Sequence, residues 1–215
     1  MTIKRPTVLL ADDHAIVAEG LRRVLETNYE VIGVVSNGRA VLAAAEQFKP
    51  DVIVLDVSMP LLNGIEAARR IHKSSQNVKI VFLSMHPDVV YVTEAFRAGA
   101  SAYVLKISAA NDILTAVRSV LQGKTYLSPS IDWAALETHI ERGQQSLQSP
   151  SKLSSRQREV LQLVAEGRNT KEIAEILHIS PRTVEFHRRR IMQALGLHST
   201  AGLVQYAIKH RLISS

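Results

Sequence analysis

The first half of the chain alternates short apolar runs with segments of helical periodicity, and this alternation limits the folds open to it. The run 52–55 is aliphatic throughout, as in a strand buried on both faces, and it stops abruptly at Asp56. Five such runs alternate with five amphipathic segments, so the sequence predicts an α/β domain: a doubly wound parallel sheet of five strands with helices on both faces. The expected strands are 7–11, 30–35, 52–55, 79–83 and 102–105, and the expected helices are 14–26, 39–48, one marked by Ile65, Ala68 and Ile71, 89–97 and 109–122.

Polar residues stand directly after four of the five expected strands. Parallel strands end at the same edge of a sheet, so these side chains should meet although they are far apart in sequence. Two carboxylates about 4 Å apart repel by roughly 4 kcal/mol at an effective dielectric near 20. A hard divalent cation with oxygen ligands, such as Mg²⁺, offsets that repulsion, and a lysine adds a compact positive charge. The residues concerned are Asp12, Asp13, Asp56, Ser84 and Lys106.

A metal ion, a carboxylate nucleophile, a lysine and a small hydroxyl together make a phosphoryl-transfer site. Asp56 is the residue on which this interpretation depends, because it ends an entirely apolar strand and an Asn63-Gly64 turn signal follows it. Taken alone, an aspartate at this position also fits a helix cap or a turn. The polar ends of the other strands favour the phosphoryl-transfer site.

These residues form a series of motifs with defined spacing. In this order, residues 5–122 resemble the receiver domain of two-component response regulators, a flavodoxin-like fold. The resemblance implies that Asp56 accepts a phosphoryl group from a sensor histidine kinase. The motifs are Asp12-Asp13, the run Asp56-x-x-Met59-Pro60-x-x-x-Gly64, Ser84, and Tyr103-x-x-Lys106.

The same resemblance assigns roles to the other site residues. Asp13, Asp56 and the backbone carbonyl of Ser58 would bind Mg²⁺, with Asp12 acting mostly through water. Ser84 and Lys106 would bind phosphoryl oxygens, and Ser84 and Tyr103 would form the switch that responds to phosphorylation. For Tyr103, a half-buried strand tyrosine is the alternative.

The character of the sequence changes after Gly123. Residues 123–150 contain a turn-like stretch, the pattern of a short amphipathic helix at 131–142, and a Gln- and Ser-rich segment typical of a linker. Residues 151–215 hold 11 Lys and Arg against 5 Asp and Glu, which equals the whole chain's net charge of +6. A basic C-terminal third indicates a polyanionic partner. We therefore expect three parts: residues 1–122, a linker at 123–150, and a C-terminal domain at 151–215.

The C-terminal part carries start and stop signals for four short helices. Ser154 with Gln157 forms a capping-box pattern, Thr170 can cap the second helix, and Ser180 precedes Pro181 at a first helical position. Two short helices joined by a tight turn, the second of them basic, predict a helix-turn-helix within a small all-α domain. The expected helices are 155–166, 170–178, 181–195 and 200–210.

Three motifs in this part resemble the LuxR-type DNA-binding domain. With a receiver in front of it, the whole chain resembles the NarL/FixJ class of response regulators. The resemblance implies that the protein binds double-stranded DNA, as a homodimer when active, through the helix at 181–195. The motifs are Leu153-Ser154-x-Arg156-x-x-Glu159-Val160-Leu161, Asn169-Thr170-Lys171-Glu172-Ile173-Ala174, and Ser180-x-Arg182-Thr183-Val184-Glu185-x-His187.

The candidate DNA contacts fall into two groups. Glu185, Phe186 and Arg189 are predicted to read base edges, and Glu185 stands where many members of the class have lysine. Phosphate contacts position a protein without specifying the sequence. The candidates for phosphate contacts are Lys171, Arg182, Thr183 and Arg188.

A phosphorylation-controlled transcription factor, not an enzyme, is the interpretation that uses all these features. A phosphohydrolase with an aspartyl-phosphate intermediate is the main alternative, because Asp56, Mg²⁺ and Lys106 would serve it. Ser58 stands where such an enzyme needs its second aspartate, and the helix-turn-helix would have no role. A phosphorylation-independent adaptor is a third interpretation, in which DNA binding would be indifferent to Asp56.

Composition places limits on the setting of the protein. No apolar run approaches the ~18 residues of a membrane span, and the N-terminus lacks a signal-peptide pattern. The chain has no cysteine, which fits the cytosol. We expect a cytoplasmic protein without a membrane partner.

Overall fold

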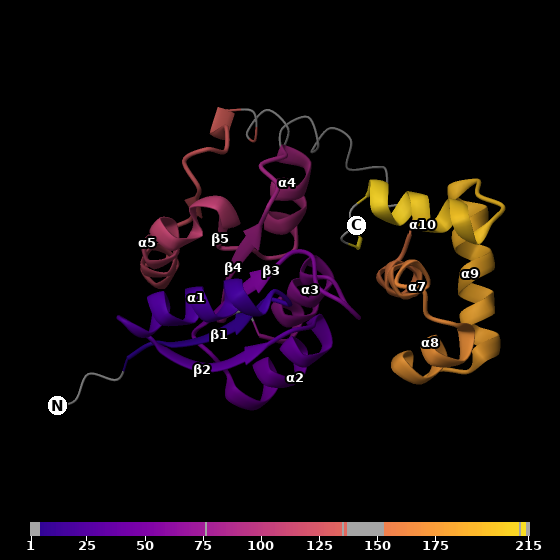
Figure 1. Cartoon of the computed structure of the whole chain (residues 1–215), viewed down its shortest axis with the longest axis horizontal. Helices are drawn as coiled ribbons and strands as arrows, with labels where there is room; N and C mark the ends of the chain where they lie inside the picture. Colours follow the sequence, from indigo (N-terminus) through magenta and orange to yellow (C-terminus); the bar gives the residue numbers. More distant parts are fainter. Residues whose placement is uncertain (1–4, 76, 135, 137–152, 211, 214–215) are drawn as a thin grey trace.

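The computed structural model describes residues 5–75, 77–134, 136, 153–210 and 212–213. These residues form two bodies that lie side by side, an N-terminal domain built on a sheet and an all-helical C-terminal domain (Figure 1). No helix among the described residues is long and apolar enough to cross a membrane. Most of the helix predicted at 131–142 and all of the predicted linker stretch 143–150 lie outside the described residues.

The N-terminal domain contains a parallel sheet with the strand order β2-β1-β3-β4-β5-β6. The five predicted strands are present, and a sixth, two-residue strand pairs parallel with β5. The prediction missed it because two residues in a Ser- and Pro-rich stretch are too short for an apolar pattern. The strands are β1 (Thr7–Ala11), β2 (Glu30–Val35), β3 (Val52–Asp56), β4 (Lys79–Ser84), β5 (Ala102–Leu105) and β6 (Tyr126–Leu127).

Helices cover both faces of this sheet. Successive residues of β1 alternate between two apolar cores, with Leu9 facing one and Leu10 the other. The first core takes in α2 (Gly38–Phe48), α3 (Gly64–Ser74) and α4 (Val89–Arg97), and the second takes in α1 (Ala15–Glu26) and α5 (Ala109–Leu121). The predicted doubly wound architecture is therefore confirmed.

The segment predicted to begin the linker belongs structurally to the N-terminal domain. Besides β6, Ile131 and Leu136 are buried in the same core as Tyr103. Ser128 donates its backbone N–H to the carbonyl of Tyr103, and its hydroxyl accepts from the backbone N–H of Leu105 at 3.0 Å. The chain therefore stays on the edge of the sheet after α5 before it reaches the C-terminal domain.

The C-terminal domain consists of four helices around one apolar core. The predicted caps at Ser154, with Gln157 completing a capping box, and at Ser180, ahead of Pro181, are confirmed. The predicted cap at Thr170 is wrong, because Asn169 one residue earlier accepts from two backbone N–H groups and forms a capping box of its own. The helices are α7 (Ser155–Ala165), α8 (Thr170–Leu177), α9 (Pro181–Leu195) and α10 (Thr200–Lys209).

The two domains meet where α7 lies against α3 and against the loop that joins β3 to α3. We call residues 57–63 the β3–α3 loop. Leu61 of this loop packs against the apolar core of the C-terminal domain, and α9 lies on the far side of that domain (Figure 1).

Candidate functional site

The carboxyl ends of β1, β3, β4 and β5 meet at one edge of the sheet, as the sequence predicts. Asp12 and Asp13 follow β1, Asp56 ends β3, and Ser84 ends β4. Lys106 follows β5 and begins a short 3₁₀ turn, η1 (Lys106–Ser108). Asp12, Asp56 and Ser84 are buried.

Lys106 joins two of the carboxylates. Its Nζ lies 2.7 Å from Oδ2 of Asp12 and 2.8 Å from Oδ2 of Asp56. Burial lowers the pKa of Lys106, but the two carboxylates outweigh burial and the pKa is raised above its ordinary value. The side chain therefore stays a fixed positive charge at neutral pH.

Asp56 is a carboxylate held in a poorly solvated place. Burial raises its pKa from 3.8 to about 6, with a smaller contribution from Asp12, while Lys106 and the backbone N–H of Ser58 favour the ionised form. The Ser58 N–H donates to Oδ1 of Asp56 at 3.2 Å. At neutral pH Asp56 is ionised but weakly hydrated, a state that suits a nucleophile.

The acidic cluster has free lone pairs for a cation. Among the described residues, no hydrogen-bond donor serves Asp13 Oδ1, which has His14 as an ionic neighbour, while Asp12 Oδ2 has the Lys106 ammonium as its ionic partner. Ligand atoms of Asp12, Asp13, His14 and Asp56 all lie within 4.8 Å of one another. Buried oxygens of this kind fit a hard divalent cation such as Mg²⁺.

Sequence reasoning missed His14. Its Nδ1 lies 3.2 Å from an oxygen of Asp12 and 3.0 Å from one of Asp13, and its backbone N–H donates to Asp12. The available signal was its position directly after the acidic pair.

A close approach of the chain to itself shapes the β3–α3 loop. A Cβ atom on Gly64 would lie 2.0 Å from the carbonyl oxygen of Asp56, so only glycine fits there. Asn63 caps α3 by accepting the backbone N–H of Glu66 at 2.9 Å. The glycine in the sequence motif therefore lets α3 begin against the end of β3.

The two predicted switch residues contact the same neighbour. The Ser84 hydroxyl accepts the backbone N–H of His86 at 3.1 Å, and the Tyr103 hydroxyl donates to the carbonyl of His86 at 2.9 Å. Tyr103 is fully buried, not half-buried. His86, in the loop between β4 and α4, links the site edge to Tyr103.

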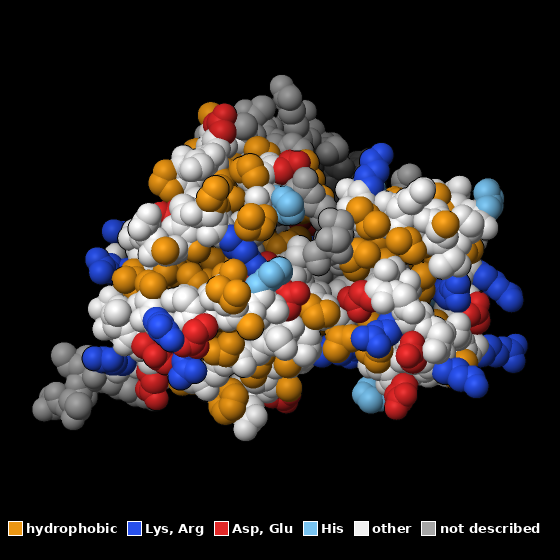
Figure 2. Space-filling model, viewed as in Figure 1, with side chains coloured by type: hydrophobic (Ala, Val, Ile, Leu, Met, Phe, Trp, Pro, Cys, Tyr) orange, Lys and Arg blue, Asp and Glu red, His pale blue; other side chains and the backbone are white. Residues whose placement is uncertain are grey.

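Helix α9 presents basic side chains on the outer side of the C-terminal domain, where Lys and Arg gather along the edge (Figure 2). Arg182 and Arg189 are exposed, and Phe186 is 55% exposed. The guanidinium of Arg190, which sequence reasoning missed, lies 5.5 Å from the centre of the Phe186 ring. An exposed aromatic ring amid arginines marks this face as a contact surface.

The remaining candidate contact residues lie close to α9 in different settings. Lys171 on α8 is exposed, and the Thr183 hydroxyl lies 2.8 Å from that of Ser180. Glu185 accepts from the Thr170 hydroxyl at 2.7 Å and pairs with Arg188 at 3.2 Å. Arg188 also donates to Thr200 at 3.1 Å, so this pair ties α9 to α8 and α10.

Comparison with known proteins matches both domains to families. Residues 8–118 match the response regulator receiver domain, and residues 151–207 match the luxR family of bacterial regulatory proteins. The transcriptional regulatory protein MctR of Rhizobium johnstonii is 36% identical over 209 residues, covering 96% of this chain and 95% of MctR. The oxygen regulatory protein NreC of Staphylococcus carnosus is 36% identical over 213 residues, covering 96% of this chain and 98% of NreC. The chain is a two-component response regulator of the NarL/FixJ class.

A solved structure of the response regulator RcsB in complex with DNA supports this membership. The alignment of the two structures covers 94% of this chain and 98% of the RcsB chain, with a TM-score of 0.58 and 27% sequence identity. Response regulators of this class regulate transcription and are not enzymes, which sets aside the phosphohydrolase alternative. The N-terminal domain is the receiver, and the C-terminal domain is of the LuxR type.

Proposed function

We propose that phosphorylation of Asp56 by a sensor histidine kinase controls DNA binding by this response regulator. An Asp56 carboxylate oxygen attacks the phosphorus of a phosphohistidine, and a P–O bond forms as the P–N bond breaks. The electron pair of the broken bond returns to the imidazole, which takes up a proton from water. The observation that carries the proposal is the buried Asp56 carboxylate. It lies 2.8 Å from the Lys106 ammonium, at the edge of the receiver's sheet where the carboxyl ends of the strands meet.

The receiver's own residues would hold both the metal and the phosphoryl group. Asp13, Asp56 and the Ser58 carbonyl are the proposed Mg²⁺ ligands, with Asp12 acting through water. Mg²⁺ bound there supplies positive charge that offsets the carboxylates and the phosphoryl oxygens. Support comes from Asp13 Oδ1, to which none of the described residues donates a hydrogen bond, and from the ligand atoms of Asp12, Asp13 and Asp56, which lie within 4.8 Å of one another. Lys106 holds one phosphoryl oxygen through its ammonium group.

Ser84 and Tyr103 are the proposed route from the phosphoryl group to the rest of the protein. The Ser84 hydroxyl accepts the backbone N–H of His86 and would donate its own hydrogen to a phosphoryl oxygen, so a shift of Ser84 towards that oxygen would move its contact with His86. The carbonyl of His86 holds the Tyr103 hydroxyl, so the loop after β4 and the tyrosine move together. Two states of this loop would give a two-state switch.

Double-stranded DNA is the proposed partner of α9. Phe186 and Arg189 would contact a thymine methyl and a guanine edge in the major groove. Lys171, Arg182 and Thr183 would contact phosphates, which fits the +6 charge of this third of the chain. The similar RcsB structure is a DNA complex, which supports this partner. Glu185 and Arg188 would have to leave their contacts within the domain to join them.

A homodimer is the proposed active form. Ala201, Gln205 and Ile208 are exposed along α10, one turn apart, and Ile208 is 42% exposed. Two such faces would pair two DNA-binding domains across an inverted-repeat site. We place the protein in the cytoplasm, where DNA and the kinase's phosphohistidine are both accessible.

Mass spectrometry tests the assignment of Asp56. With Mg²⁺ and acetyl phosphate, the wild type should gain about 80 Da, the mass of one phosphoryl group, on the peptide that contains Asp56. Asp56→Asn keeps the shape of the side chain and removes the nucleophile, so it should gain nothing. Equal phosphorylation of the two proteins would overturn the assignment.

A further inference from the structure

Gln162 of α7 and Glu166, the residue that directly follows α7, hold the β3–α3 loop of the receiver. Gln162 is 1% exposed and bridges the loop: its Oε1 accepts the backbone N–H of Asn63 at 2.9 Å, and its Nε2 donates to the carbonyl of Met59 at 2.9 Å. Glu166 accepts the backbone N–H of Leu61 at 3.0 Å and also the Gln162 amide at 2.8 Å. The C-terminal end of α7 and its cap residue therefore satisfy three backbone groups of the loop.

One residue of the β3–α3 loop, Leu61, has an unusual backbone conformation where the loop meets the DNA-binding domain. Leu61 has a φ of 66°, a left-handed conformation that residues with a Cβ seldom adopt. Its side chain packs against the core of the DNA-binding domain, which compensates for that conformation. The strained residue is therefore held by the other domain.

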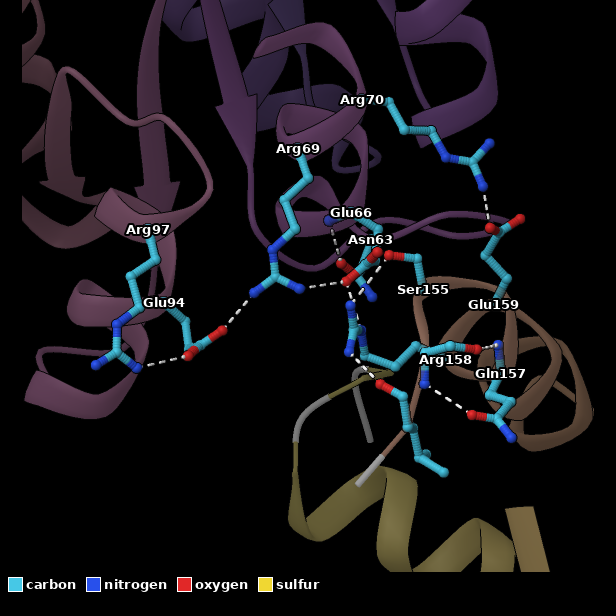
Figure 3. A network of polar contacts seen from close by, with 12 residues as sticks. Asn63, Glu66, Arg69, Arg70, Glu94, Arg97, Ser155, Gln157, Arg158 and Glu159 are labelled. Carbon is cyan, nitrogen blue, oxygen red and sulfur yellow. Dashed lines mark hydrogen bonds and ion pairs between the residues drawn. The ribbon is translucent and has the colours of Figure 1, made fainter. Parts of the chain in front are cut away.

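Buried ion pairs flank this contact and fix its register (Figure 3). Glu159 of α7 is buried and pairs with Arg39 at 3.2 Å and with Arg70, both in the receiver. Arg158 pairs with the buried Glu66 of α3 at 2.6 Å. Removing one partner of a buried pair leaves an uncompensated charge, so these pairs resist sliding of α7 along α3.

The same loop carries the chemistry of the receiver. It follows Asp56 directly, and the backbone N–H of Ser58 donates to the Asp56 carboxylate. A cavity of about 220 Å³ lies beside the site, with one wall from the receiver and the other from the DNA-binding domain. Its lining residues are Asp13, Ser58, Met59, Pro60, Ala165, Glu166 and Ile213.

The DNA-reading surface is not what this contact covers. Helix α9 lies on the opposite side of its domain from the receiver (Figure 1). Phe186 is 55% exposed, and Arg182 and Arg189 are exposed as well. The part of the receiver that the DNA-binding domain contacts directly is the β3–α3 loop beside Asp56.

We propose that Gln162 and Glu166 are positioning residues for the phosphorylation site, and that the DNA-binding domain restrains the chemistry of Asp56 by holding the β3–α3 loop. This inference rests on the proposed function, in which Asp56 is the phosphoryl acceptor and Ser58 supplies a metal ligand. Metal binding and phosphorylation then compete with the α7 contact. Coupling of binding equilibria is reciprocal, so releasing α7 and binding Mg²⁺ favour each other by the same factor.

Substitution of Gln162 tests the inference on the full chain. Gln162→Met keeps the size of the side chain and removes its hydrogen bonds to the loop. We expect acetyl phosphate to phosphorylate this variant at least roughly fivefold faster than it phosphorylates the wild type. We expect the variant to bind Mg²⁺ more tightly by a similar factor. Fivefold is the lower end of typical allosteric coupling. Gln47→Ala, at an exposed position of α2, is the matched control and should behave as wild type.

Glu166→Gln separates charge from hydrogen bonding. It keeps the oxygen that accepts from Leu61 and Gln162 but removes the negative charge beside the site. We expect a much smaller acceleration than that of Gln162→Met, because the amide oxygen still accepts both hydrogen bonds. An acceleration equal to that of Gln162→Met would show that charge at the cavity, not restraint of the loop, controls the reaction, and would overturn the inference.

A distance measurement reports whether the domains separate. The chain has no cysteine, so spin labels can be placed at Ala43→Cys on α2 and Glu175→Cys on α8, both exposed positions. We expect longer distances in Gln162→Met before phosphorylation, and in the wild type only after it. An unchanged distance in Gln162→Met would overturn the inference.

The rate and affinity measurements distinguish two failures. If the wild type takes up no phosphoryl group, the proposed function fails. If the wild type is phosphorylated and Gln162→Met shows the same rate and the same Mg²⁺ affinity, the restraint by α7 fails while the proposed function stands.

Discussion

Replacing Asp56 by asparagine should stabilise the receiver at neutral pH. The pKa of Asp56 is raised by burial from 3.8 to about 6. Each pKa unit corresponds to about 1.4 kcal/mol, so ionising this side chain in the folded state costs about 3 kcal/mol relative to the unfolded chain. Asparagine has a similar shape and no charge, and the variant escapes that cost.

The sign of the effect depends on pH. Below about pH 3 Asp56 is protonated in both the folded and the unfolded state, and the cost is absent. As pH rises towards the folded-state pKa of about 6, only the unfolded state ionises freely, so the wild type loses stability. The advantage of Asp56→Asn should therefore be near zero at about pH 3 and reach about 2–3 kcal/mol above about pH 7.

Urea unfolding across this pH range is the assay. Trp133 is the single tryptophan of the chain and lies between Ile131 and Leu136, which are buried in the receiver core, so its fluorescence follows the receiver. Groups that do not interact with Asp56 titrate alike in the two proteins and cancel in the difference. Saturating Mg²⁺ should narrow the gap at neutral pH by stabilising the wild type. A variant less stable than the wild type above about pH 7 would refute the reasoning.

Three further substitutions test the switch and the DNA surface. Ser84→Ala should accept the phosphoryl group but lose most of the gain in DNA affinity, measured by fluorescence anisotropy; an undiminished gain would exclude the route through His86. Arg189→Ala should cost about 1–3 kcal/mol of DNA binding and relax preference at one base pair, measured by binding-site selection; an unchanged motif would exclude a base contact. Lys171→Ala should weaken binding to all DNA sequences alike, and the slope of log binding constant against log salt concentration should become shallower by about one. A weakening confined to one sequence would contradict a phosphate contact.

The architecture of the receiver and the edge that carries its site were readable from the sequence. Strands buried on both faces give uninterrupted apolar runs, and the residue that ends each run must lie at the common edge of a parallel sheet. Asp12, Asp56, Ser84 and Lys106 meet there for that reason. The β6 strand escaped prediction because it is defined by its pairing with β5, not by its own two residues.

The contact between the domains was not readable from the sequence. Glu159 and Gln162 are polar residues on a helix, a pattern that normally indicates a solvated face, yet both are 1% exposed. Their partners come from α2, α3 and the β3–α3 loop, about 90 to 120 residues away in the chain. The periodicity of a helix holds no information on such distant pairs. It also does not show whether Asn169 or Thr170 caps α8, because both residue types can cap a helix and they are adjacent.

DNA affinity before and after phosphorylation tests the central claim most directly. The probe is a DNA fragment that the wild-type protein itself selects, titrated by fluorescence anisotropy with and without acetyl phosphate and Mg²⁺. The account predicts that phosphorylation tightens binding by the wild type by about 5- to 150-fold, the range of typical allosteric coupling, and leaves Asp56→Asn unchanged. Equal affinities of phosphorylated and unphosphorylated wild type, or the same gain in Asp56→Asn, would contradict it.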